Sequence, residues 1–172
     1  IVAECRPVSL SECFELIGEL PLHFEPGTEG RYSNTNYFLL GHILEILTCK
    51  PLSAAMRDVF MRFGLNHTHM NGRIADACGY VKHNDEVFSC GRPAMESGDS
   101  SVVSSLTDLG LWCNAILNAD ILSANSWKEC LNFTPKPYGC GLWQFDHGWF
   151  GHDGGLPGLR HWQRLNFKDK AA

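Results

Sequence analysis

Histidines and cysteines are the side chains of this chain that could most readily hold a metal ion or attack a carbonyl group. His67 and His69 are two residues apart, so on a strand both would point to the same side and could share a metal. A third ligand could come from His147, His152 or His161. No carboxylate or thiol stands at a matching spacing, however, and single exposed histidines are common. The pattern favours isolated histidines, and we expect no metal and no cofactor.

The eight cysteines form no recognised metal or redox motif. They stand at positions 5, 13, 49, 78, 90, 113, 130 and 140 without a Cys-x-x-Cys pair, which argues against a zinc ribbon or a thioredoxin-type site. In a chain with its own core, isolated cysteines are more often small buried side chains than a disulfide framework, so we expect most to be unpaired. A nucleophilic pair of Cys90 or Cys140 with His152 is conceivable, but nothing marks either thiol as activated.

Composition and charge exclude two classes of partner. The chain has 172 residues, of which 44% are apolar and 19% charged, as in ordinary folded proteins. Its net charge is −5 and its basic residues are scattered, so we expect no nucleic-acid partner. The longest apolar stretch, residues 37–47, is interrupted by Gly41 and Glu45 and falls short of the roughly 20 residues that cross a bilayer. We therefore expect a soluble chain without a membrane span; its compartment stays unknown.

The first two thirds of the chain predict helices. Apolar residues at helical spacing mark residues 9–20, 36–47 and 52–63, and a further helix begins at Ser104 or Ser105. Residues 126–131 predict a short helical turn. In the second of these helices, the apolar stripe consists of Tyr37, Leu40, Ile43, Leu44 and Leu47, and we expect it to pack inward.

From Gly139 onward the apolar period changes from that of a helix to that of a strand. Residues 141–145 and 158–162 predict antiparallel strands joined through residues 148–155. Two further short strands are expected near residues 79–81 and 87–89.

Helices followed by strands indicate an α+β fold. We expect residues 1–131 to form a mainly helical part and residues 132–172 to form the antiparallel strand segment. Both parts are expected to belong to a single compact unit.

Three short segments carry recognisable patterns in a fixed order. Residues 26–41 contain Pro-Gly, then Tyr-Ser-Asn at 32–34, then Leu-Gly; residues 104–109 read SSLTDL; residues 138–143 read YGCGLW and are followed by GHDGGLPG at 151–158. Together they resemble the serine β-lactamase-like family, which includes class C β-lactamases, D-alanyl-D-alanine peptidases and related esterases. The resemblance covers most of the chain and implies a partial β-lactamase/transpeptidase-like fold.

The resemblance assigns two roles to the Tyr-Ser-Asn segment. Tyr32 would be a general base or proton relay, which requires positive charge nearby to lower its phenol pKa from about 10. Asn34 would hydrogen-bond the substrate amide and a catalytic lysine. Without the resemblance, we would interpret Tyr32 as an aromatic side chain packed at the start of the helix over residues 36–47. Asn34 or Thr35 would then be the cap of that helix.

The same resemblance assigns the other side of the site to the GHDGG segment. His152 and Gly154 would face the substrate, because strand alternation puts both on one side and turns Asp153 away. The backbone of Gly154, Gly155 and Leu156 would bind substrate and contribute an N–H to an oxyanion hole. His152 also fits a turn residue before an Asp-Gly-Gly hairpin. If the family assignment holds, Tyr32, Asn34 and His152 converge on one cleft.

One element of the family pattern is absent from this sequence. The family uses a serine of a Ser-x-x-Lys motif to attack a β-lactam, peptide or ester carbonyl, and no serine here has a lysine three positions later. In the family that motif lies well upstream of the Tyr-Ser-Asn segment. We therefore expect the chain to begin and end inside the family fold and, taken alone, to be inactive.

The resemblance thus implies a hydrolase of amides or esters whose partner is a small-molecule or peptide substrate with a carbonyl group. An N-terminal segment outside these residues, or a separate chain, would supply the serine. The alternative is a non-catalytic binding or structural protein built on a shortened family fold, and such a protein could be a homo-oligomer because shortening exposes strand edges and apolar helix faces.

Overall fold

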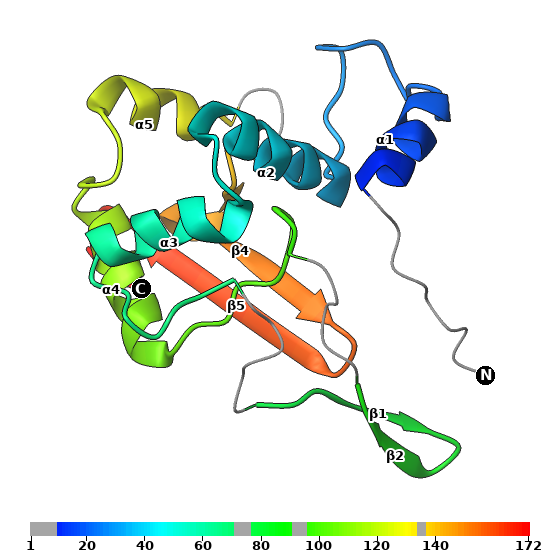
Figure 1. Cartoon of the computed structure of the whole chain (residues 1–172). Coiled ribbons are helices and arrows are strands. Elements are labelled where there is room, and N and C mark those ends of the chain that lie inside the picture. Colours follow the sequence, from blue (N-terminus) through cyan, green and yellow to red (C-terminus); the bar gives the residue numbers. More distant parts are fainter. Residues whose placement is uncertain (1–9, 71–76, 91–95, 134–136) are drawn as a thin grey trace. The chain divides into compact units, whose positions relative to one another are not determined.

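The computed structural model describes residues 10–70, 77–90, 96–133 and 137–172 (Figure 1). By its internal contacts the chain divides into a first unit, Ile1–Ser33, and a second unit, Asn34–Ala172. The first unit contains helix α1 (Leu10–Glu19), and the second contains all the other elements. The expectation of a single compact unit with parts on either side of residue 131 stays a prediction.

Four α-helices of the second unit lie where the spacing of apolar residues predicts them. They are α2 (Asn34–Thr48), α3 (Leu52–Arg62), α4 (Leu106–Leu117) and α5 (Ala124–Cys130). Ser105 caps α4, because its side chain accepts a hydrogen bond from the backbone N–H of Asp108 at 3.1 Å. Helix α2 starts two residues earlier than predicted, so Asn34 is its first residue rather than a cap outside it.

The strands form two separate antiparallel sheets. Strands β1 (Tyr80–His83) and β2 (Glu86–Ser89) make a hairpin, and β3 (Trp143–Gln144), β4 (Trp149–Leu156) and β5 (Leu159–Asn166) make a three-stranded sheet in that order. The mixed helix and strand content confirms the α+β fold class.

One expected element of the sheet is wrong. Residues 148–155 are not a connection between two strands but contribute most of the middle strand, β4, which pairs with both β3 and β5. Their glycine content is typical of a loop, yet cross-strand pairing keeps this backbone extended. The actual turn between β4 and β5 is the Pro157-Gly158 dipeptide.

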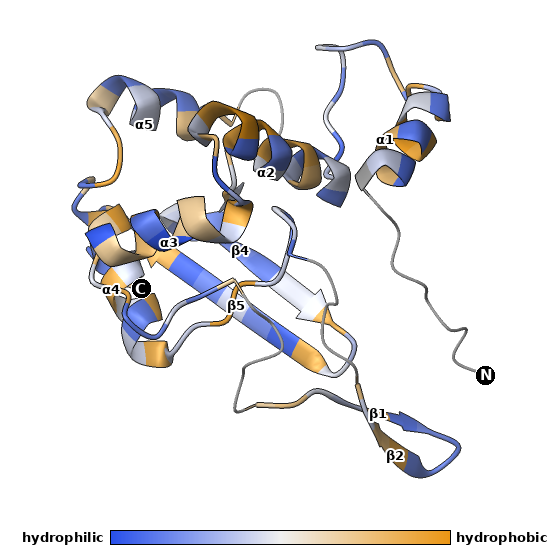
Figure 2. Ribbon diagram, viewed as in Figure 1, coloured by the Kyte–Doolittle hydropathy of each residue, from blue (hydrophilic) through white to orange (hydrophobic). Residues whose placement is uncertain are grey.

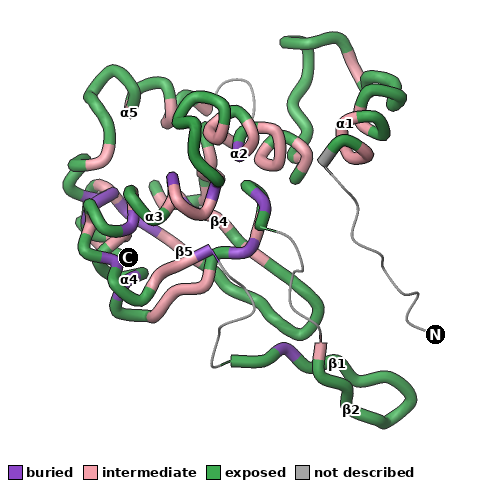
Figure 3. The backbone as a smooth tube through the Cα atoms, viewed as in Figure 1, coloured by how far each residue is buried: buried purple, intermediate pink, exposed green. Residues whose placement is uncertain are grey.

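The core of the second unit consists of two apolar clusters that share Trp112 of α4. One contains Leu52, Phe60, Leu65 and Met70, with Leu44, Met56, Phe63 and Trp112 packed against it. The other contains Ile116, Leu117 and the fully buried Leu165, with Trp112, Cys113, Ile121, Trp127 and Phe167 around it. Figure 3 shows these buried positions on α3, on α4 and at the end of β5. Helix α4 therefore joins the helical layer to the sheet.

Helix α2 is apolar on more sides than the core uses (Figure 2). Leu44 packs against the first cluster, but Leu40, Ile43 and Leu47 of the predicted inward stripe are 55%, 48% and 76% exposed. Among the described residues, no single helix is long and apolar enough to cross a membrane; α2 and α3 pass that test only as a pair bent by 84°.

Candidate functional site

Strand β4 carries the residues that the GHDGG segment singles out. His152 lies opposite Gln163 of β5, and Gly154 lies opposite His161. Asp153 forms an ion pair with Arg164, while His152 bonds to Tyr138, so neighbouring residues of β4 have different partners. A hydrogen bond from Arg164 lowers the pKa of the Asp153 carboxyl below its ordinary value.

One edge of β4 is paired over only part of its length. The backbone N–H of Phe145 donates to the carbonyl of Trp149 at 2.8 Å, so this carbonyl points toward the β3 side of the strand. Backbone groups alternate along a strand, which directs those of Asp153 and Gly155 to the same edge. Strand β3 pairs with β4 only at Phe150 and Gly151. Beyond Gly151, no strand in the described part of the chain pairs with this edge.

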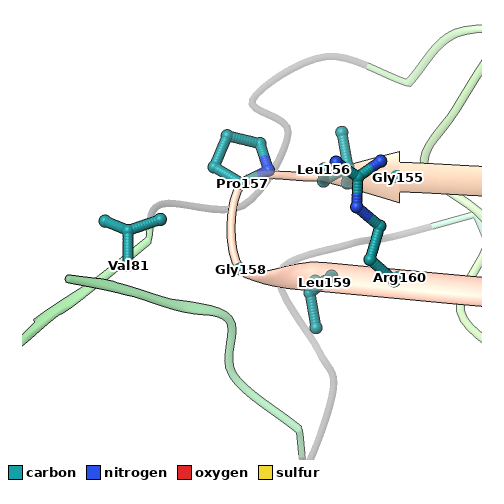
Figure 4. Close-up of a pocket in the computed structure, with 7 residues that line it drawn as sticks. All are labelled: Val81, Gly155, Leu156, Pro157, Gly158, Leu159 and Arg160. Carbon is teal, nitrogen blue, oxygen red and sulfur yellow. The ribbon is translucent and has the colours of Figure 1, made fainter.

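Two glycines on β4 make room for side chains of β5. A Cβ at Gly154 would clash with the ring of His161, and a Cβ at Gly155 would clash with the guanidinium of Arg160. Arg160 extends alongside Gly155 and Leu156, as Figure 4 shows. With Val81 and residues 157–159, these three line a surface hollow of about 520 Å³. The positive charge of Arg160 therefore lies beside the Gly155 backbone.

A chain of hydrogen bonds connects α2 to β4. The hydroxyl of Tyr138 lies 3.2 Å from Nε2 of His152 and also bonds to the hydroxyl of Tyr37, a residue of α2. Nδ1 of His152 lies 2.7 Å from the carbonyl oxygen of Asp153. The tyrosine–histidine chain, as we call Tyr37, Tyr138 and His152, was not assigned from the sequence. Tyr37 lies in the family-like segment at residues 26–41, and Tyr138 lies in the one at residues 138–143. Their place in these segments is the signal that could have identified them.

The predicted site residues fall in different parts of the molecule. His152, Gly154, Gly155 and Leu156 lie on β4, and Asn34 begins α2 three residues before Tyr37. The tyrosine–histidine chain therefore ties the helix of Asn34 to the strand of His152. Tyr32 belongs to the first unit, and its convergence with His152 stays a prediction.

The SSLTDL segment builds a buried anchor at the start of α4. Asp108 is only 2% exposed, and its Oδ2 accepts hydrogen bonds from the His67 backbone N–H and the Thr68 hydroxyl, both at 2.7 Å. Burial on its own raises the pKa of Asp108, but the hydrogen bonds from Thr68 and His67 outweigh it and leave that pKa below its ordinary value. We call Asp108, His67, Thr68 and Ser105 the Asp108 network.

The cysteines and histidines show no assembled metal centre in the part of the chain that the structure describes, where no group of three metal-binding side chains gathers. Seven cysteines fall in that part, and six of them are free thiols: Cys13, Cys49, Cys90, Cys113, Cys130 and Cys140. Cys5 lies outside it. Cys130 and Cys140 are neighbours, since the backbone N–H of Cys140 donates to the Cys130 carbonyl at 3.2 Å. Burial, and then the neighbouring Cys140, raise the pKa of the Cys130 thiol.

The order of these segments and the fold around them match a known family. Residues 6–166 fit the family model described as Beta-lactamase. The chain belongs to the β-lactamase family. Putative D-alanyl-D-alanine carboxypeptidases of Salmonella paratyphi B and Salmonella enteritidis are each 36% identical to this β-lactamase-family chain over 64 residues, which is 37% of the chain and 15% of the relative.

Solved structures show the same fold. The D-stereospecific amidohydrolase from a Streptomyces species is 23% identical with a TM-score of 0.71, over 84% of this β-lactamase-family chain and 48% of that structure. The D-amino acid amidase from Ochrobactrum anthropi SV3, complexed with L-phenylalanine amide, is 23% identical with a TM-score of 0.73, over 89% and 51%. The match thus spans about half the length of these structures and 15% of the matched carboxypeptidases.

Proposed function

We propose that this chain forms one side of the active site of a β-lactamase-family hydrolase that cleaves the amide bond of a short peptide or an amino acid amide. In this proposal Tyr32, Asn34 and His152 are catalytic residues, and the backbone of Gly154, Gly155 and Leu156 holds the substrate. The observation that carries the proposal is the edge of β4, where His152 is adjacent to backbone groups that no described strand pairs.

The proposed chemistry needs a serine from outside these 172 residues, because the sequence contains no Ser-x-x-Lys. The serine oxygen attacks the carbonyl carbon while Tyr32, with the family's lysine, accepts the hydroxyl proton. Collapse of the tetrahedral intermediate breaks the C–N bond, and the proton passes to the leaving amine. Water then hydrolyses the acyl-enzyme and regenerates the serine.

The geometry of β4 supports an oxyanion-binding role for Gly155. Its backbone N–H is directed by strand alternation to the edge that β3 leaves unpaired. The guanidinium of Arg160 lies beside the same residue, which favours negative charge on an oxygen bound there. This N–H would share the oxyanion with that of the nucleophilic serine.

The substrate class is inferred from the relatives. Those with names that describe a reaction are a D-alanyl-D-alanine carboxypeptidase, a D-stereospecific amidohydrolase and a D-amino acid amidase. All three names specify the D configuration, and two of them name the hydrolysis of amides. We therefore propose D-configured dipeptides or amino acid amides as substrates of the complete hydrolase.

The test begins with the coding sequence that surrounds these residues. We expect a Ser-x-x-Lys upstream, and we expect the protein that includes it to give one fluorophosphonate adduct, on that serine, by intact mass. The 172-residue chain should give no adduct and should not hydrolyse D-phenylalanine amide. A gene without Ser-x-x-Lys, or an adduct on any serine within these residues, would overturn the proposal.

A second candidate is a non-catalytic protein that binds another chain. The exposed apolar residues of α2, above all Ile46 and Leu47 at 63% and 76% exposure, favour it because contiguous apolar patches often mark interfaces. Light scattering separates the two candidates. A stable dimer that Leu47→Glu dissociates, together with a gene that lacks Ser-x-x-Lys, would favour the binding protein.

A further inference from the structure

We propose that the Asp153 carbonyl holds His152 in a single tautomer, with the hydrogen on Nδ1 and the lone pair on Nε2, and that Tyr138, supported by Tyr37, is the positioning residue that donates to that lone pair. A role for this tautomer in catalysis rests on the proposed function. The tautomer itself follows from the hydrogen-bond geometry of the second unit, to which all three residues belong.

The first step concerns the hydrogen on the imidazole ring. Nδ1 of His152 lies 2.7 Å from the carbonyl oxygen of Asp153. A carbonyl oxygen has no hydrogen and can only accept, so Nδ1 must be the donor. A neutral imidazole carries one N–H, which leaves Nε2 with a lone pair.

The second step gives the direction of the remaining bonds. The Tyr138 hydroxyl lies 3.2 Å from the Nε2 lone pair, so Tyr138 donates to His152. That bond uses the only hydroxyl hydrogen of Tyr138, and the bond between the two phenols must therefore be donated by Tyr37. Donation thus runs in one direction, from Tyr37 to Tyr138, to His152 and to the Asp153 carbonyl.

Packing around Tyr138 keeps its hydroxyl in place. Its ring meets the edge of Trp143 with centroids 4.5 Å apart and that of His152 with centroids 5.7 Å apart. Tyr138 also forms a β-bridge with Trp143, and the next residue, Gly139, donates its N–H to the Leu142 carbonyl at 2.9 Å. These ring and backbone contacts restrict the Tyr138 side chain, so its hydroxyl stays beside His152.

The direction of the chain depends on the charge of His152. When Nε2 gains a proton it becomes a donor, so Tyr138 must accept from it. The hydroxyl hydrogen of Tyr138 can then turn to the oxygen of Tyr37, which reverses that bond as well. Both phenols keep a partner in either state. Protonation of His152 therefore changes the hydrogen bond of Tyr37 in α2, the helix that begins with Asn34.

The tautomer can be read directly by long-range ¹H–¹⁵N NMR of the chain, at a pH where His152 is neutral. We expect a protonated Nδ1 and an unprotonated Nε2 in the unmodified protein. Tyr138→Phe should keep the hydrogen on Nδ1, because the Asp153 carbonyl still accepts it, but should change the Nε2 shift because that nitrogen loses its donor. Tyr37→Phe should give a smaller change in the Nε2 shift. Tyr80→Phe, in the exposed hairpin strand β1, is the matched control and should change neither nitrogen.

Two results would overturn the inference: a protonated Nε2 in the unmodified protein, or a Tyr138→Phe spectrum that matches that of Tyr80→Phe. The protonation of Nε2 is measured in the unmodified protein, so this result tests the tautomer even if Tyr138→Phe fails to fold. The readout does not depend on catalysis. The expected tautomer, found together with a complete Ser-x-x-Lys protein that does not hydrolyse D-phenylalanine amide, would contradict the proposed function and leave this inference intact.

Discussion

Two polar networks in the second unit join distant segments by different means. The Asp108 network connects residues 41 positions apart, and the tyrosine–histidine chain connects residues 101 positions apart. The first is centred on a carboxylate that is 2% exposed. The second consists of phenols and an imidazole that are only half-buried.

The difference between the networks shows what each can do. A buried carboxylate is stable only while its donors remain in place, because a buried charge without hydrogen bonds is costly. The Asp108 network therefore holds the start of α4 in one arrangement. Hydroxyl and imidazole groups can each donate or accept, so the tyrosine–histidine chain can reverse its direction and suits a place where a proton moves.

The largest effect should come from breaking the Asp108 network. Asp108→Ala leaves the His67 N–H and the Thr68 hydroxyl without their acceptor, and we expect Tm to fall by roughly 5–10 °C. Asp120→Ala, which removes an exposed carboxylate just after α4, is the control and should change Tm little. Thermal unfolding followed by circular dichroism tests this, and equal losses in the two variants would contradict it.

Acid should weaken the Asp108 network. The pKa of Asp108 lies below its ordinary value of 3.8, so the unfolded state binds more protons and stability rises with pH in this range. The contribution of Asp108 is complete above the unfolded pKa and is lost as pH falls through the folded pKa, below about 4. Urea unfolding between pH 5 and pH 2.5 should show a flatter pH dependence in Asp108→Asn than in the unmodified protein. Parallel curves would contradict this.

A smaller effect is expected in the tyrosine–histidine chain. Tyr37→Phe removes the hydrogen bond between the two phenols, and Tyr138→Phe removes that bond and the one to His152. All three groups are half-buried, and each variant should lower Tm by about 2–4 °C. Because the two hydroxyls bond to each other, the double variant should lose less than the sum of the single losses. Additive losses in a double-mutant cycle would show that the two phenols act independently.

The smallest effect concerns the thiols next to Tyr138. Burial raises the pKa of the Cys130 thiol, which lowers its thiolate fraction at pH 8. Its side chain is also less accessible than that of Cys140, which is exposed. We expect iodoacetamide to modify Cys130 several-fold more slowly than Cys140, as measured by peptide mass spectrometry. Faster modification of Cys130 than of Cys140 would contradict this prediction and would show that the segment around Tyr138 is accessible to solvent.

The helices could be predicted from the sequence because their signals are local. The cap of α4 is an example, since Ser105 and Asp108 are three residues apart and make their bond within one turn. The apolar pattern missed the middle strand, because the glycines of residues 148–155 are typical of a loop; only the family resemblance treats His152 and Gly154 as strand positions. The packing of α2 also escaped prediction: its apolar stripe shows which residues share a face but not which of them the core covers.

The candidate site was predictable only where a motif marks it. His152 and the glycines after it stand in a family-like segment, and strand alternation then separates His152 from Asp153. The contact between Tyr37 and Tyr138 joins residues 101 positions apart, and no local pattern encodes such a pairing. Its direction also depends on a backbone carbonyl, which every residue of the sequence has.

The central claim is that the unpaired edge of β4 faces the substrate, and an NMR titration with D-phenylalanine amide tests it most directly. We predict saturable shifts of the Gly155 backbone N–H and the His152 ring, while the resonances of β1 stay unchanged. Shifts confined to other parts of the chain, with Gly155 and His152 unmoved at saturation, would contradict the account.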